Sequence, residues 1–210
     1  MIARSLGVFT FVAGAAALVA GLALLGRGPG LPEQTRHLRA MKDRSEPPAD
    51  VRDVDMQFFA ALPHHGPFAE RERLERQGVR MQGWVQRILL SGDGDIHVEL
   101  AQNRRTNADR DTVYVVAEIT PPWRQQRRGW AYDSLLVAFR PNRGGPSAWD
   151  AGPRRVRLTG WLLYDHPYDR VLTAWIQEHG NSRRTGWEIH PVTGIELWDD
   201  ATRGWRELTR

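Results

Sequence analysis

The sequence predicts a mainly β fold: a small five-stranded OB-like barrel with one short helix, preceded by an N-terminal transmembrane or signal helix. Three observations support this fold class. Five segments show the period of two that marks a half-buried strand. Two of them carry a glycine in mid-strand, which permits strong coiling. Their order, three strands, a short helix and two strands, is that of a partly open Greek-key barrel, although a small β-sandwich would give similar local patterns.

The strand signals are clearest in DIHVEL, where apolar and charged residues alternate without interruption. The tight turn SGDG precedes this segment, and Gly83 and Gly160 mark bends in two other strands. Pro191 requires a bulge or an edge position because proline cannot donate a ladder hydrogen bond. We expect a short helix near Tyr132–Phe139. The predicted strands span residues 79–90, 95–100, 112–119, 154–164 and 186–198.

The N-terminal segment predicts a membrane anchor. Leu6 to Leu25 form an uncharged stretch of 20 residues, about the length that spans a bilayer. Arg4 supplies a basic start, and we favour an uncleaved anchor over a signal cleaved near Ala20–Ala23. Five basic residues follow the segment, and by charge alone they would keep the domain in the cytoplasm. They are Arg27, Arg36, Arg39, Lys42 and Arg44.

The chain of 210 residues fits one domain plus a leader. It has no cysteine, which excludes disulfides, thiol nucleophiles and cysteine-based metal sites. Its net charge of +4 is too small to indicate nucleic-acid binding by itself. We expect an anchor at residues 1–26, a linker at 27–50, a short helical lead-in at 51–78, the β domain at 79–199 and a C-terminal tail at 200–210.

Four segments resemble an uncharacterised family of bacterial secreted or envelope proteins with an OB-like domain. The run WEIHPVT carries the most specific part of the resemblance. It implies export and an OB-like fold, and no reaction. Many family members have cysteines and a longer loop where this chain has the short SGDG turn. The segments are residues 83–100, 115–121, 155–165 and 183–197.

One group of polar residues has the chemistry of a metal site. Asp95, His97 and Glu99 project from one face of a predicted strand, and Glu188 and His190 do so from the last strand. If the two strands meet, these side chains could hold zinc, manganese or a related divalent ion. Such an ion could activate water for a nuclease or phosphoesterase. The alternative is that both faces are solvated and stabilised by ordinary cross-strand pairs.

A second group combines arginine with aromatic residues. It comprises Trp161, Arg155, Arg183, Arg184 and Tyr114. Arginine and aromatic side chains on an OB-type face can hold single strands or sugars. The alternative is that the arginines pack on aromatic rings at the rim of the domain.

Three functions are therefore open. We favour a non-catalytic module that binds an envelope protein or an oligomeric ligand, with nucleic acid possible but not favoured. A metal-dependent hydrolase and a structural envelope protein are the alternatives. We expect residues 6–25 to hold the domain at the inner membrane, facing the periplasm or the outside, with secretion after cleavage as the alternative.

Overall fold

A computed structural model describes residues 33–64, 67–104, 113–140, 154–166 and 183–209. The expected anchor at residues 6–25 lies outside these residues. The helices are α2 (Glu33–Lys42), α3 (Met56–Ala61), α4 (Phe68–Leu74), α5 (Pro121–Gln125) and α6 (Tyr132–Phe139), with a 3-10 turn η1 (Arg128–Trp130). The strands are β1 (Val51–Val54), β2 (Gly78–Leu90), β3 (Ile96–Ala101), β4 (Tyr114–Ile119), β5 (Arg155–Tyr164), β6 (Arg183–Asp199) and β7 (Gly204–Glu207).

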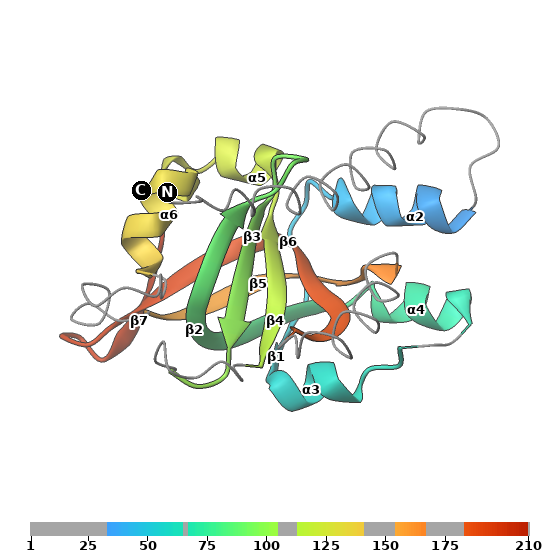
Figure 1. Ribbon diagram of the computed structural model, residues 1–210, viewed down its shortest axis with the longest axis horizontal. Coiled ribbons are helices and arrows are strands. Elements are labelled where there is room, and N and C mark those ends of the chain that lie inside the picture. Colours follow the sequence, from blue (N-terminus) through green and yellow to red (C-terminus); the bar gives the residue numbers. More distant parts are fainter. Residues whose placement is uncertain (1–32, 65–66, 105–112, 141–153, 167–182, 210) are drawn as a thin grey trace, which may run out of the picture.

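The seven strands among the described residues form one sheet in the order β1-β2-β3-β4-β6-β5, with β7 added to β6. β2 also pairs with β5, so five strands form a partial ring. The β4–β6 and β1–β2 pairs are parallel, and the remaining pairs are antiparallel. Helices α5 and α6 lie between β4 and β5 in the chain, and Figure 1 shows α6 at the left of the view, α5 at the top and α2 at the right.

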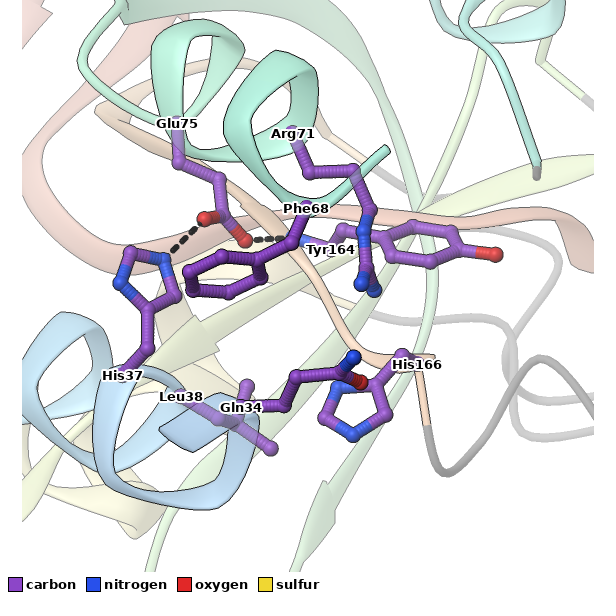
Figure 2. A pocket seen from close by; sticks show the side chains of 8 residues that line it. All are labelled: Gln34, His37, Leu38, Phe68, Arg71, Glu75, Tyr164 and His166. Atoms are coloured by element: carbon purple, nitrogen blue, oxygen red, sulfur yellow. Dashed lines mark hydrogen bonds and ion pairs between the residues drawn. The ribbon is translucent and has the colours of Figure 1, made fainter. Parts of the chain in front are cut away.

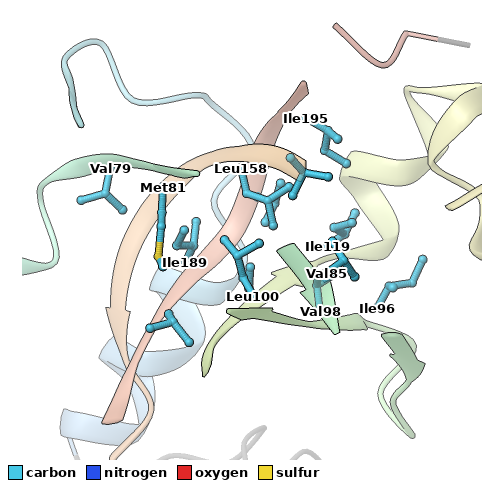
Figure 3. Packing of buried hydrophobic residues seen from close by; sticks show 14 of the residues in the cluster. Val79, Met81, Val85, Ile96, Val98, Leu100, Ile119, Leu158, Ile189 and Ile195 are labelled. Atoms are coloured by element: carbon cyan, nitrogen blue, oxygen red, sulfur yellow. The ribbon is translucent and has the colours of Figure 1, made fainter. Parts of the chain in front are cut away.

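Apolar side chains fill the inside of the ring. Figure 3 shows residues from all five ring strands converging there, among them Met81, Leu100, Ile119, Leu158 and Ile189. Each of these five is fully buried. Because side chains alternate across a strand, their polar neighbours project from the outer surface. This alternation places two sets of functional residues outside the core.

The five predicted strands and the helix at Tyr132–Phe139 are confirmed. The bulge expected at Pro191 is also present, because the β5–β6 register shifts beside Gly160. Three segments differ from expectation. The expected linker contains α2, the helical lead-in begins with the strand β1, and the expected tail contains β7.

Each difference has a physical reason. α2 has the polar sequence EQTRHLRAMK, with only three apolar residues and none buried, so no apolar run marks it in the sequence. β1 is only four residues long and pairs in parallel with β2, a contact between segments far apart in the chain. Asp55 then begins α3 by accepting a hydrogen bond from the backbone N–H of Phe58 at 2.9 Å. β7 forms because the chain turns back after Asp199 and pairs with β6.

Gly160 should tolerate no side chain. A Cβ atom at this position would overlap the carbonyl oxygen of Pro191 and a methyl group of Ile189. We expect Gly160→Ala to lower the free energy of unfolding by about 1–3 kcal/mol, the usual cost of overpacking. Denaturant unfolding measures this change. Gly92→Ala is the control because nothing lies within 4 Å of a Cβ there, and equal losses in both variants would contradict the packing at Gly160.

Candidate functional site

A cluster of charged side chains lies on the outer face of β3, β4 and β6. His97 on β3 is paired in register with Glu118 on β4, and Glu188 on β6 pairs with Val116. Asp95 immediately precedes β3, at the end of the turn that follows β2. The parallel β4–β6 pairing brings these residues together, since it aligns the end of β4 with the middle of β6.

Glu118 is the centre of this cluster. One of its oxygens, Oε2, lies 2.9 Å from Nδ1 of His190. The other, Oε1, lies 3.3 Å from Nδ1 of His97. Nζ of Lys42, at the end of α2, is 3.9 Å from Oε2. A single carboxylate therefore joins β3, β4, β6 and α2.

The two ring nitrogens of His190, Nδ1 and Nε2, have different surroundings. Nδ1 also lies 3.1 Å from Oε1 of Glu188. Nε2 is fully buried and has no hydrogen-bond partner in the part of the chain that the structure describes. Its nearest charged atom is Oδ2 of Asp95, at 3.7 Å. This distance is too long for a hydrogen bond.

Two cationic side chains, Arg183 and Lys42, form ion pairs with carboxylates of the cluster. Arg183 is buried and its guanidinium lies 3.1 Å from Oε2 of Glu188. Lys42 also lies 3.7 Å from Oδ2 of Asp165, which directly follows β5. Burial disfavours the charge of Lys42, but the surrounding carboxylates outweigh this effect and raise its pKa.

The pKa values of the inner residues diverge. Burial alone would lower the pKa of His190, yet hydrogen bonds to Glu118 and Glu188 raise it to about 9. Burial raises the pKa of Asp95 to about 7, against the opposing charge of His190. Burial also raises the pKa of Glu188, helped by the charge of Glu118. For Glu118, hydrogen bonds from His190 and His97 outweigh burial and lower the pKa. Glu118 is thus the carboxylate that stays ionised.

The structure brings together four of the five residues expected to bind metal: Asp95, His97, Glu188 and His190. Glu99 lies at the edge of the cluster, with its Oε1 3.9 Å from Nε2 of His97, and the guanidinium of Arg87 on β2 holds it there. The central residue, Glu118, was not among the predicted ligands. The signal was present, because Glu118 is the single acid in an otherwise apolar strand, YVVAEI.

The residues expected to bind a ligand are spread over different surfaces. Trp161 donates its indole N–H to the carbonyl of Glu46 at 2.8 Å, and the guanidinium of Arg44 covers its ring. Arg183 is buried in the charged cluster, whereas Arg184 is exposed. Tyr114 is half-buried at the start of β4, where it pairs in register with Arg183. Only Arg155 of the five lines a groove.

That groove, of about 490 Å³, lies over the outer face of β2 and β5 and beside the β6–β7 turn. We call it the Arg–Trp groove. Two rings form its floor, and guanidinium groups cover them: Arg104 over Trp84 and Arg155 over Trp198. The tryptophans and arginines that line it are Trp84, Arg104, Arg140, Arg154, Arg155, Trp198 and Arg206.

Positive charge is in excess in the Arg–Trp groove. Two acids, Asp199 and Asp200, also line it against five arginines. Both acids accept hydrogen bonds within the turn, from the backbone of Ala201 and from the indole of Trp198. No carboxylate among the described residues forms an ion pair with Arg104, Arg140 or Arg154. The groove therefore presents unneutralised guanidinium groups.

Comparison with protein-family models and with curated proteins finds no match to this chain. Any function must therefore be argued from the site itself. Among the described residues, no helix is both long and apolar enough to cross a bilayer.

A second hollow, of about 540 Å³, continues from the Arg–Trp groove along β1 and β2. The hydrogen bond from Arg155 to Gln82, at 2.8 Å, joins the two hollows, since Arg155 lines the first and Gln82 the second. Arg80 in this second hollow is neutralised by Asp53 through two hydrogen bonds. Arg157 there pairs with Glu196, so among the described residues only Arg52 in this hollow lacks a carboxylate partner, against three arginines in the Arg–Trp groove.

A third pocket lies between α2, α4 and the end of β5, and Figure 2 shows its lining residues. Its volume of about 10 Å³ is roughly that of one water molecule. Glu75 accepts a hydrogen bond from the backbone of Tyr164 at 3.0 Å and lies 2.5 Å from Nε2 of His37. These contacts tie α2 to the domain, and we assign the pocket a structural role.

Proposed function

We propose that this domain is a non-catalytic binding module, and that its Arg–Trp groove binds an anionic oligomer. The observation that carries the proposal is a group of arginines, Arg104, Arg140 and Arg154, that have no carboxylate partner among the described residues and gather around two tryptophans. Guanidinium groups bind carboxylates and phosphates through two parallel hydrogen bonds. A ligand with repeated anionic groups would engage several of them at once.

The chemistry of the groove favours an acidic polysaccharide over a single-stranded nucleic acid. Bases bind single-strand platforms by stacking on open aromatic faces. Here a guanidinium covers a face of Trp84 and of Trp198, and Trp198 also packs edge-on against Trp205. The rings thus serve mainly to hold the arginines in place. A polymer of uronic acids needs only charge and hydrogen bonding from such a surface.

We further infer that the five-stranded partial ring is an OB-type barrel. The strand order, the single parallel pair within the ring and the helices between β4 and β5 support this assignment. OB folds bind oligosaccharides and oligonucleotides, usually on the face of their second and third strands. The Arg–Trp groove lies instead over β2 and β5, the first and fourth strands of the ring. We place the domain outside the cytoplasm because its segments resemble a family of exported proteins, and we assign residues 6–25 as its membrane anchor because of their length and apolar character.

The charged cluster gives the hydrolase hypothesis less support. A catalytic metal needs an open coordination position that substrate can reach. His190 is 0% exposed, and the side chains of Asp95 and Glu118 are 10% and 11% exposed. The residues with hydrolytic chemistry are therefore enclosed, whereas the Arg–Trp groove is open.

Binding can be tested with the full-length protein in a mild detergent and a fluorescently labelled polyuronate oligomer. We expect the oligomer to bind, and we expect added salt to weaken binding because salt screens exposed charges. The double variant Arg140→Gln/Arg154→Gln should bind roughly tenfold or more weakly, since every 1.4 kcal/mol is a factor of ten in affinity. Fluorescence anisotropy measures both effects.

A matched control also removes two exposed arginines, in the variant Arg73→Gln/Arg184→Gln. It should bind the polyuronate as the unaltered protein does. An equal loss in both double variants would assign the binding to net charge and would contradict the groove. Tighter binding of a thymidine oligonucleotide than of the polyuronate would favour nucleic acid, and no binding of either would leave a structural role.

A further inference from the structure

We propose that Asp95, Glu118 and His190 form a structural binding site for a divalent transition-metal ion such as zinc. Each residue offers one ligand atom, and the three atoms lie within 4.8 Å of one another. Imidazole with carboxylates is a donor set that zinc and manganese accept. This site is separate from the Arg–Trp groove, and the inference does not depend on the proposed function.

The orientation of His190 is the strongest evidence for this site. Its Nδ1 is engaged by Glu118 and Glu188, at 2.9 and 3.1 Å. In metalloproteins a histidine ligand commonly donates one ring N–H to a carboxylate, which directs its other nitrogen to the metal. Glu188 would keep that contact with Nδ1, and the carboxylate of Glu118 would turn from Nδ1 to the ion. Here the other nitrogen, Nε2, is buried without a hydrogen-bond partner among the described residues and faces Asp95. A buried polar atom without a partner is costly, and a metal ion would supply one.

The charge balance of the cluster points to the same ligand. Among the described residues, and apart from the Glu99–Arg87 pair, it contains four carboxylates, from Asp95, Glu118, Asp165 and Glu188, linked in one chain of contacts. Two permanent cations, Lys42 and Arg183, offset two of them. Metal ligation requires a neutral His190, so the ion would displace the proton that the metal-free cluster holds there, and two formal negative charges would then remain among these groups. A divalent cation neutralises that remainder.

The burial of the ligands assigns the ion a structural role. Asp95 directly precedes β3, Glu118 is the penultimate residue of β4, and His190 lies in the middle of β6. A metal bound to all three would join three strands that are distant in sequence. His97, which lies 3.3 Å from Glu118, would act as a positioning residue for that ligand.

A substitution at Lys42 distinguishes a metal site from a cluster that is held together by ion pairs alone. Nζ of Lys42 lies 3.9 Å from Glu118, so its charge would repel a bound cation. Replacing Lys42 with methionine should therefore tighten metal binding by roughly tenfold. The same change would lose two ion pairs, with Glu118 and Asp165, in a cluster without metal.

The experiment uses the full-length protein in detergent, freed of metal by a chelator and titrated separately with zinc, manganese, magnesium and calcium. Thermal unfolding should shift upward by roughly 2–8 °C at saturating zinc or manganese. Calorimetry should report one ion per chain. Asp95→Asn should abolish the shift while leaving the circular dichroism spectrum unchanged. Glu99→Gln is the matched control, because Glu99 pairs with Arg87, and it should keep the full shift.

Three results would overturn the proposal. The first is that none of the four ions binds the folded protein at millimolar concentration. The second is that Asp95→Asn and Glu99→Gln respond to zinc and manganese alike. The third is that Lys42→Met binds the ion no more tightly than the unaltered protein, which would place any bound ion elsewhere.

Discussion

Replacing Glu118 with leucine should lower the free energy of unfolding by about 3–5 kcal/mol, the usual cost of removing one member of a buried ion pair. The reason is that Glu118 is the shared partner of His190, His97 and Lys42. His190 is fully buried, so its charge would be left without its closest counterion. Urea unfolding monitored by circular dichroism measures the change.

Glu99→Leu is the control for this prediction. Glu99 is also buried on the outer face of the ring, but its partner Arg87 is exposed and keeps its water when the carboxylate is removed. We expect this variant to lose about 1 kcal/mol or less. A loss in Glu118→Leu no greater than in Glu99→Leu would contradict the central place of Glu118.

The stability of the metal-free protein should fall as pH rises from about 6.5 to about 9. His190 has an ordinary pKa of 6.5 that the folded state raises to about 9. The stabilisation contributed by protonated His190 is therefore complete below pH 6.5 and is lost as pH rises through the pKa of the folded state. The shift corresponds to a change on the order of 3 kcal/mol in the free energy of unfolding.

Asp95 contributes in the same direction at lower pH. The folded state raises its pKa to about 7, so the stabilisation contributed by protonated Asp95 is lost as pH rises from its ordinary pKa to about 7. Glu118 has the opposite effect. The folded state lowers its pKa, so the stabilisation contributed by ionised Glu118 is lost as pH falls into the acid range. Urea unfolding in the presence of a chelator, at pH 6 to 9.5, should show the decline. The decline should be much smaller in His190→Gln, and an equal slope in both proteins would contradict the assignment to His190.

The sequence allowed the five ring strands to be predicted because each carries a period of two against a single core. Segments such as IHVELA keep their apolar residues on one side in any register, so their local pattern is sufficient. β1 could not be found in this way, because its pairing with β2 is parallel and links segments far apart in the chain. α2 was not predicted because its sequence is mostly polar and prolines lie on both sides of it, a composition typical of a linker.

The candidate sites were predicted only in part, for reasons of topology. Asp95 and His190 could be recognised as potential ligands from the strand periodicity, but the parallel β4–β6 pair places Glu118 between them. The Arg–Trp groove was harder to predict. Arg104, Arg140 and Arg154 follow or precede different elements, and only the closing pair of β2 with β5 brings them around Trp84.

Hydrogen–deuterium exchange of the full-length protein, with and without the polyuronate oligomer, tests the proposed binding surface most directly. We expect slower exchange at the backbone amides of Arg104, Arg140 and Arg154 and in the β6–β7 turn around Asp200, which surround the Arg–Trp groove. The amides of Arg73 and Arg184 should exchange at unchanged rates. Protection confined to the outer face of β3 and β4, or no protection at a saturating concentration of the oligomer, would contradict the assignment of the groove as the binding site.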